Sequence, residues 1–115
     1  MQTARPNFIE LPARDIGKSK AFYQSVFGWT LTEFGPTYAC TMTGDVDVGL
    51  QGNRAEASAA PLPVICVADL EAALAVVIKA GGRIVRPIFS FPGGRRFQFL
   101  DPSDNEIAVM APSES

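Results

Sequence analysis

Two stretches of the chain, FIELPARDIGKSKAFYQSVFGW at residues 8–29 and LPVICVADLEAALAVVIKAGGR at residues 62–83, repeat one pattern at a distance of 54 residues. Each stretch opens with a short strand-like run, and an aspartate, Asp15 or Asp69, follows. An aspartate at a helix N-cap accepts hydrogen bonds from the free amides of the first turn. Apolar residues at helical spacing then lead to a glycine. The repeat therefore predicts helices over 16–27 and 70–80.

Three strand-like runs follow each predicted helix, with glycine, proline and aspartate between them. They lie at 29–34, 37–42 and 46–51 after the first helix, and at 83–89, 95–100 and 106–111 after the second. The predicted order is βαβββ twice, which is an α+β fold. We expect one domain over 1–115, with a first module at about 6–52, a linker at 53–61 and a second module at about 62–111. The strands should form a cupped mixed sheet with the helices on its outer face and a trough inside.

Composition excludes several classes of function. The net charge is −2 and no basic run is present, so the sequence predicts no nucleic-acid partner. No apolar stretch approaches the roughly 20 residues that span a bilayer, which predicts a cytoplasmic protein without a membrane partner. Cys40 and Cys66 are expected to be buried thiols. The chain has no histidine, which removes Ser-His-Asp and Cys-His nucleophile pairs and imidazole metal sites.

The repeated pattern, together with FYQSVFGW at 22–29 and DPSDNEIAV at 101–109, resembles the glyoxalase, bleomycin-resistance and extradiol dioxygenase group, the vicinal oxygen chelate superfamily. Within it the chain is most similar to short glyoxalase-like proteins. The resemblance implies four metal-ligand positions, at the first, fourth, fifth and last strands. They fall on Phe8, the stretch 49–51, Leu62 and Ala108, and within 49–51 only Gln51 could coordinate an ion. We therefore expect no metal and no cofactor.

The remaining acidic residues divide into turn residues and one candidate for function. Asp45 and Asp47 could be imagined as a metal pair, but an aspartate beside glycine at a strand entrance is typical of turns. Asp101 and its neighbours also indicate a turn. Glu10 differs, because strand alternation places it on the face of Phe8, which the resemblance assigns to the trough. It is a candidate general base, a structural ion-pair partner of a basic residue such as Arg96, or a ligand contact.

The resemblance and the alternation together predict a set of ligand-binding residues: Phe8, Glu10, Tyr38, Leu62, Arg96, Gln98 and Ala108, with Phe89 as further lining. The preferred interpretation is a metal-free protein that binds a small organic ligand in an apolar trough. One alternative is a metal-independent isomerase or lyase in which Glu10 is the base and Arg96 stabilises the anion. Another is a non-catalytic interaction module whose trough is filled by its own side chains.

A homodimer is also expected, because family members of this size usually complete their troughs at a twofold interface. Trp29, directly after the first helix, belongs either to the core or to a dimer contact. The trough closes either within one chain or across two.

Overall fold

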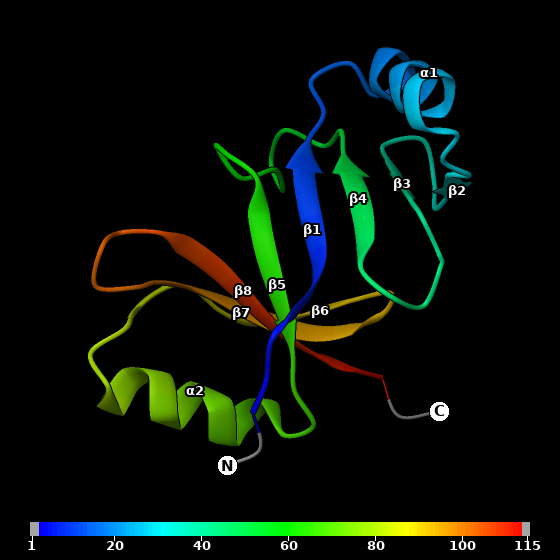
Figure 1. Ribbon diagram of the computed structural model, residues 1–115. Coiled ribbons are helices and arrows are strands. Elements are labelled where there is room, and N and C mark those ends of the chain that lie inside the picture. The colour runs from blue at the N-terminus through cyan, green and yellow to red at the C-terminus, as the bar shows by residue number, and fades with distance from the viewer. Residues whose placement is uncertain (1–2, 114–115) are drawn as a thin grey trace. The chain divides into compact units, whose positions relative to one another are not determined.

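The computed structural model describes residues 3–113, which divide into two compact units with the same order of elements (Figure 1). Residues 7–62 form the first unit, and residues 63–113 with the N-terminal 3–6 form the second. Apart from Pro6, the first unit contains β1 (Pro6–Pro12), α1 (Ile16–Phe27), β2 (Thr32–Glu33), β3 (Tyr38–Cys40) and β4 (Asp47–Gln51). Apart from Leu62, the second contains β5 (Leu62–Cys66), α2 (Leu70–Lys79), β6 (Arg83–Phe91), β7 (Gly94–Leu100) and β8 (Glu106–Pro112).

Strand pairing is the same in both units. The first unit has the order β2-β3-β4-β1, and the second has the order β5-β8-β7-β6. The first and last strands of each module, β1 with β4 and β5 with β8, pair in parallel, and the other pairs are antiparallel. The predicted α+β class and the two βαβββ modules are confirmed.

Equivalent aspartates begin the two helices, as the repeat predicts. Asp15 accepts a hydrogen bond from the amide of Lys18 at 3.1 Å, and Asp69 accepts one from the amide of Ala72 at 3.0 Å. Helix α1 ends at Phe27, and its C-cap Gly28 has a left-handed φ of 69° and donates its amide hydrogen bond to the carbonyl of Gln24. Helix α2 ends one residue earlier than predicted, at Lys79, with Ala80 as its C-cap.

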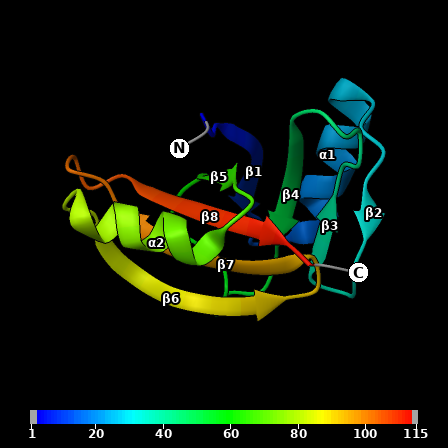
Figure 2. The same cartoon turned by 90° about the horizontal axis from the view of Figure 1, so that it is seen from below.

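Each helix packs on one face of its own sheet. In the second unit, α2 runs along β8, β7 and β6, and the buried core there consists of Leu70, Phe97, Val109 and Ala111 (Figure 2). A bidentate ion pair adds to this contact, since Arg95 of β7 donates to Glu71 of α2 at 2.6 and 2.9 Å. In the first unit, the buried core below α1 consists of Ala13, Leu31, Ala39 and Leu50.

Two predicted segments differ from the structure. The run 29–34 is a strand only at Thr32–Glu33, because Leu31 is buried in the core and the ring of Trp29 stacks on that of Tyr23 at 4.5 Å. Trp29 therefore packs against the core of its own unit. The second difference is the gap between the predicted strands at 83–89 and 95–100, which is shorter, because β6 and β7 extend until Phe91 and Gly94 pair as the last residues of a hairpin.

The predicted linker belongs to the first unit. Its Asn53 carbonyl accepts hydrogen bonds from the amides of Glu56 and Ala57 at 3.0 and 2.9 Å, which makes a short turn. Neither helix among residues 3–113 has the length and apolar character needed to cross a membrane.

Candidate functional site

In the first unit, Phe8 and Glu10 lie on the face of the sheet opposite α1. Leu11 and its neighbours on β3 and β4, Ala39 and Leu50, pack towards the helix, so alternation turns Phe8 and Glu10 the other way. Glu10 is only 4% exposed, and it pairs directly with Gly49 of the adjacent parallel strand. A carboxylate with so little contact with solvent is costly unless other groups interact with it.

Gly49 lies under two aromatic side chains of this face. A Cβ at position 49 would lie 2.2 Å from the Tyr38 hydroxyl and 2.7 Å from Cζ of the Phe8 ring. Both distances are far below van der Waals contact, so glycine at this position leaves room for both aromatic side chains. Phe8, Glu10, Tyr38 and Gly49 therefore form one continuous surface, which we call the aromatic patch.

Asp47 holds the turn at the end of this face. Its carboxylate accepts hydrogen bonds from Thr41 Oγ1 at 2.7 Å, from Thr43 N and Oγ1 at 2.8 Å each, and from Gly44 N at 3.0 Å. Partial burial raises the pKa of Asp47, but these hydrogen bonds outweigh that effect and lower it to about 2. The turn interpretation is confirmed, because the carboxylate is already engaged by turn donors.

The cysteines are free thiols, as predicted, although only Cys40 is fully buried and Cys66 is partly exposed. Burial raises the pKa of Cys40, and the charge of Asp47 raises it further. Since the thiolate is the reactive form, Cys40 is not an activated nucleophile.

In the second unit, Arg96 and Gln98 lie on the sheet face opposite α2. Phe97 and Phe99 between and beside them pack with the core under the helix, as the alternation requires. Arg96 is 8% exposed and Gln98 is 2% exposed. Gln98 pairs with Ala108, which is fully buried and pairs on its other side with Val64. Leu62, at the start of β5, is also buried.

The amide of Gln98 has a fixed orientation. Its Nε2 donates to Glu106 Oε2 at 2.5 Å, which directs its carbonyl oxygen away from that carboxylate. Within the described chain, this Oε1 atom is buried and accepts no hydrogen bond. A buried acceptor without a donor is unusual in native proteins.

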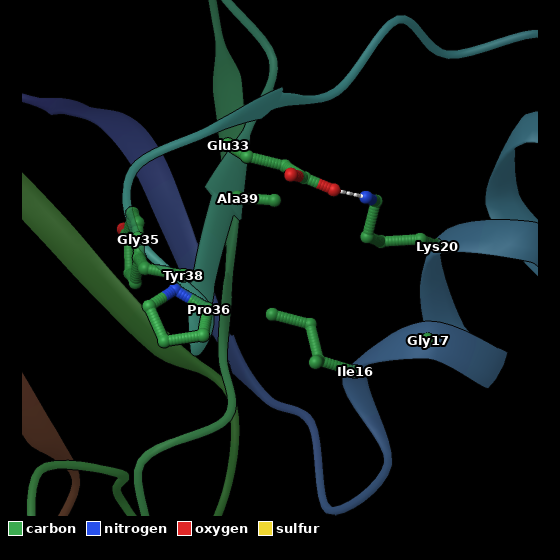
Figure 3. Close-up of a pocket in the computed structure, with 8 residues that line it drawn as sticks. All are labelled: Ile16, Gly17, Lys20, Glu33, Gly35, Pro36, Tyr38 and Ala39. Carbon is green, nitrogen blue, oxygen red and sulfur yellow. Dashed lines mark hydrogen bonds and ion pairs between the residues drawn. The ribbon is translucent and has the colours of Figure 1, made fainter.

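Two cavities lie in the first unit. One, of about 230 Å³, lies between α1 and the β2–β3 hairpin, where Tyr38 of the aromatic patch is one of its lining residues and Lys20 forms an ion pair with Glu33 (Figure 3). Burial is low at Glu33, and the hydrogen bond from Lys20 lowers its pKa. The other, of about 420 Å³, lies beyond the ends of β1 and β4 and is lined partly by Arg14 and Arg54.

The Glyoxalase/Bleomycin resistance protein/Dioxygenase superfamily model matches residues 5–109, which is nearly the whole chain. This chain belongs to that superfamily. The resemblance read from the repeat and from the DPSDNEIAV ending is thereby confirmed.

Curated relatives include a Mycobacterium tuberculosis protein and a Mycobacterium bovis protein, both named "Putative glyoxylase CFP32". Each is 28% identical over 90% of this chain, which spans only 44% of the length of either relative.

Solved structures share the fold at low identity. A hypothetical protein from Bacillus halodurans has a TM-score of 0.79 at 14% identity, over 99% of this chain and 98% of its own. The methylmalonyl-CoA epimerase of Mycobacterium tuberculosis has a TM-score of 0.73 at 14% identity, over 96% of this chain and 89% of its own.

Strand register shows which residue of the stretch 49–51 occupies the fourth-strand metal position that the superfamily resemblance implies. Glu10 pairs with Gly49 in β1–β4, and Val64, its counterpart at the 54-residue shift, pairs with Ala108 in β5–β8. Gly49 is therefore the counterpart of Ala108. Gln51, the one residue of that stretch whose side chain could coordinate an ion, is two residues further on, and its side-chain oxygen accepts a hydrogen bond from the Asn53 amide at 2.9 Å.

The residues at the four positions do not fit a metal ion. They are an aromatic ring, a glycine, a leucine and an alanine: Phe8, Gly49, Leu62 and Ala108. None of these side chains supplies an oxygen, nitrogen or sulfur donor. Nor does any other part of residues 3–113 bring three His, Cys, Asp or Glu side chains close enough to hold an ion.

Two residues of these faces, Arg86 and Glu106, were not predicted as site residues, and Gly49 was predicted only as part of the stretch 49–51. Their places depend on the register of neighbouring strands, which a single sequence does not specify. Glu10 and Arg96 belong to different units, so an ion pair between them stays a prediction.

Proposed function

We propose that this superfamily member binds a small organic molecule, without a metal ion, on the sheet faces that turn away from the helices. The observation that carries the proposal is the aromatic patch. At Gly49, a position where the resemblance implies a metal ligand, the side chain is missing and the space is taken by the Tyr38 hydroxyl and the Phe8 ring. An apolar surface with one buried polar group, Glu10, is typical of small-molecule sites.

An enzymatic role is the second candidate, and the burial of Glu10 favours it. A buried carboxylate beside a bound ligand is suited to proton transfer, and an arginine such as Arg96 would stabilise the anion that forms. A third candidate, an interaction module, is supported by the way Phe8 and Tyr38 fill the space above Gly49. The three candidates differ in the role of the Glu10 carboxylate, which contacts the ligand in the first, transfers a proton in the second and has only a structural role in the third.

Glu10→Gln keeps the shape of the side chain and removes its charge, so it distinguishes a role of Glu10 in ligand binding from a role in stabilising the fold. If Glu10 contacts the ligand, we expect affinity for a screened ligand to fall about tenfold, since a charge-assisted hydrogen bond is lost, while the melting temperature changes little. Titration calorimetry and thermal melts measure the two effects. Glu33→Gln is the matched control, because Glu33 is exposed and pairs with Lys20. Unchanged affinity with a large drop in melting temperature would assign Glu10 to a structural ion pair.

We also propose a homodimer in which the exposed face of α1 contacts a second copy of this chain. Phe22, Val26 and Phe27 are 56%, 53% and 65% exposed, which is a large apolar surface for one short helix. The curated relatives, being more than twice as long, have room for a second pair of modules in one chain. A second copy would supply that pair here.

Light scattering tests the dimer directly, and we expect about twice the mass of one chain. Val26→Glu should give monomers, because a carboxylate cannot be buried unpaired in an apolar contact. Ile78→Glu, on the exposed side of α2 at 55% exposure, is the matched control and should stay dimeric. A monomeric wild type at tens of micromolar concentration would contradict the proposal.

A further inference from the structure

Two arginines of the second unit meet over one aromatic ring on the face opposite α2. The guanidinium carbon of Arg86 lies 3.8 Å from the centre of the Phe89 ring, and that of Arg96 lies 5.2 Å from the same centre. Arg96 is also 5.7 Å from the centre of Phe91. An aromatic ring attracts cations on its faces, so Phe89 holds two like charges close together.

Gln98 adds a buried acceptor to this pair of cations. It pairs with Arg86 across β6 and β7, and it lies two residues from Arg96 on the same face. Its Oε1 atom is buried without a hydrogen bond among the described residues, while Nε2 is held by Glu106. The cluster thus presents positive charge and an acceptor that needs a donor.

We propose that the cluster of Arg86, Phe89, Arg96 and Gln98 binds a small organic acid that carries a hydroxyl or N–H donor next to its carboxylate. The carboxylate contacts the guanidiniums, the donor bonds Gln98 Oε1, and the apolar part lies against the phenyl rings. This assignment rests on the proposed function and names the ligand class of its second-unit face.

The guanidinium groups of the cluster can bind an anion beside their present partners. Glu106, which accepts the hydrogen bond from Gln98 Nε2, leaves the buried Gln98 Oε1 atom available to a donor of the same ligand. Both arginines interact with other groups of the protein as well. A guanidinium nevertheless has five N–H donors in a planar fork, so it can hold a carboxylate in addition to its existing contacts.

Three related probes separate the two features of the ligand. Mandelate carries both a carboxylate and an adjacent hydroxyl, phenylacetate lacks the hydroxyl, and mandelamide keeps the hydroxyl without the charge. Titration calorimetry on the full chain should rank mandelate first. We expect mandelamide to bind at least about tenfold more weakly, and phenylacetate several-fold more weakly.

Variants at three arginines of β6 and β7 test whether the preference for mandelate comes from the cluster. Arg96→Met and Arg86→Met should each weaken mandelate binding about tenfold and reduce its advantage over mandelamide. Arg95→Met is the matched control, since it removes the same charge from β7 but on the side that faces Glu71 of α2. It should leave mandelate affinity within about twofold. Arg86 is half-buried, so its variant keeps the test informative if Arg96→Met does not fold.

Each outcome decides the assignment. Equal affinity for mandelate and mandelamide, or an Arg95→Met effect as large as that of Arg96→Met, would overturn it. Absence of binding by all three probes at millimolar concentration would also overturn it. Binding of a neutral or basic compound to the same face would then uphold the proposed function without the acid assignment, whereas no binding by any class of compound would overturn both.

Discussion

Gly49→Ala should lower the free energy of unfolding by about 1–3 kcal/mol, the usual cost of forcing an extra carbon into a packed site. The added Cβ would lie 2.2 Å from the Tyr38 hydroxyl and 2.7 Å from the Phe8 ring, so at least one ring must move. Ligand affinity should fall with stability, because both rings belong to the aromatic patch. Chemical denaturation and titration calorimetry measure the two losses.

A double-mutant cycle with Tyr38→Phe identifies the cause of the Gly49→Ala effect. Removing the hydroxyl relieves the shortest contact, so the Gly49→Ala penalty should be smaller in the Tyr38→Phe background. Gly17→Ala is the matched control, because its Cβ would meet only Asp15 Oδ1 at 3.6 Å inside helix α1. A helical glycine replaced by alanine should be neutral or stabilising. If Gly49→Ala were as stable as the wild type, the packing of the aromatic patch described above would be wrong.

Asp47→Ala should destabilise the chain by about 2 kcal/mol at neutral pH, because the partly exposed carboxylate accepts hydrogen bonds from Thr41, Thr43 and Gly44. The effect has a defined pH window. The folded pKa of about 2 lies below the ordinary value of 3.8, so the stabilisation is complete above about pH 4 and is lost as pH falls towards 2.

Denaturant unfolding between pH 7 and pH 2 measures this window. The difference in stability between the wild type and Asp47→Ala should shrink as the wild-type carboxylate is protonated. Asp45→Ala, in the same turn, is the control and should show only a small difference in stability. A constant difference for Asp47→Ala down to pH 2 would show that its charge does not hold the turn.

Much of the fold could be predicted from the sequence because its signals are local. The N-cap aspartates, the left-handed Gly28 and the Asp101 turn each act through neighbouring backbone groups. Asp101, for example, accepts hydrogen bonds from the amides of Ser103 at 2.8 Å and Asn105 at 2.9 Å. The shortening of β2 was not predictable in this way, because it depends on Trp29 stacking against a helix residue.

The candidate site was predicted in part, for a physical reason. Alternation within one strand placed Phe8 with Glu10 and Arg96 with Gln98 on their faces. The partner of each residue on the next strand depends on register, which a single sequence does not specify when turns vary in length. Gly49 opposite Glu10 and Arg86 opposite Gln98 both became visible only through strand pairing.

The most direct test of metal-free ligand binding is an NMR screen of the full, chelator-treated chain against small acids, neutral amides and amines. We expect at least one compound to shift the amide signals of Glu10 and Gly49, or those of Gln98 and Ala108, and the shifts to be unchanged when Zn²⁺, Ni²⁺ or Mn²⁺ is added. Elemental analysis of the same sample should find no stoichiometric divalent ion. Binding that occurs only after metal is added, or about one equivalent of metal per chain that survives the chelator, would contradict the account.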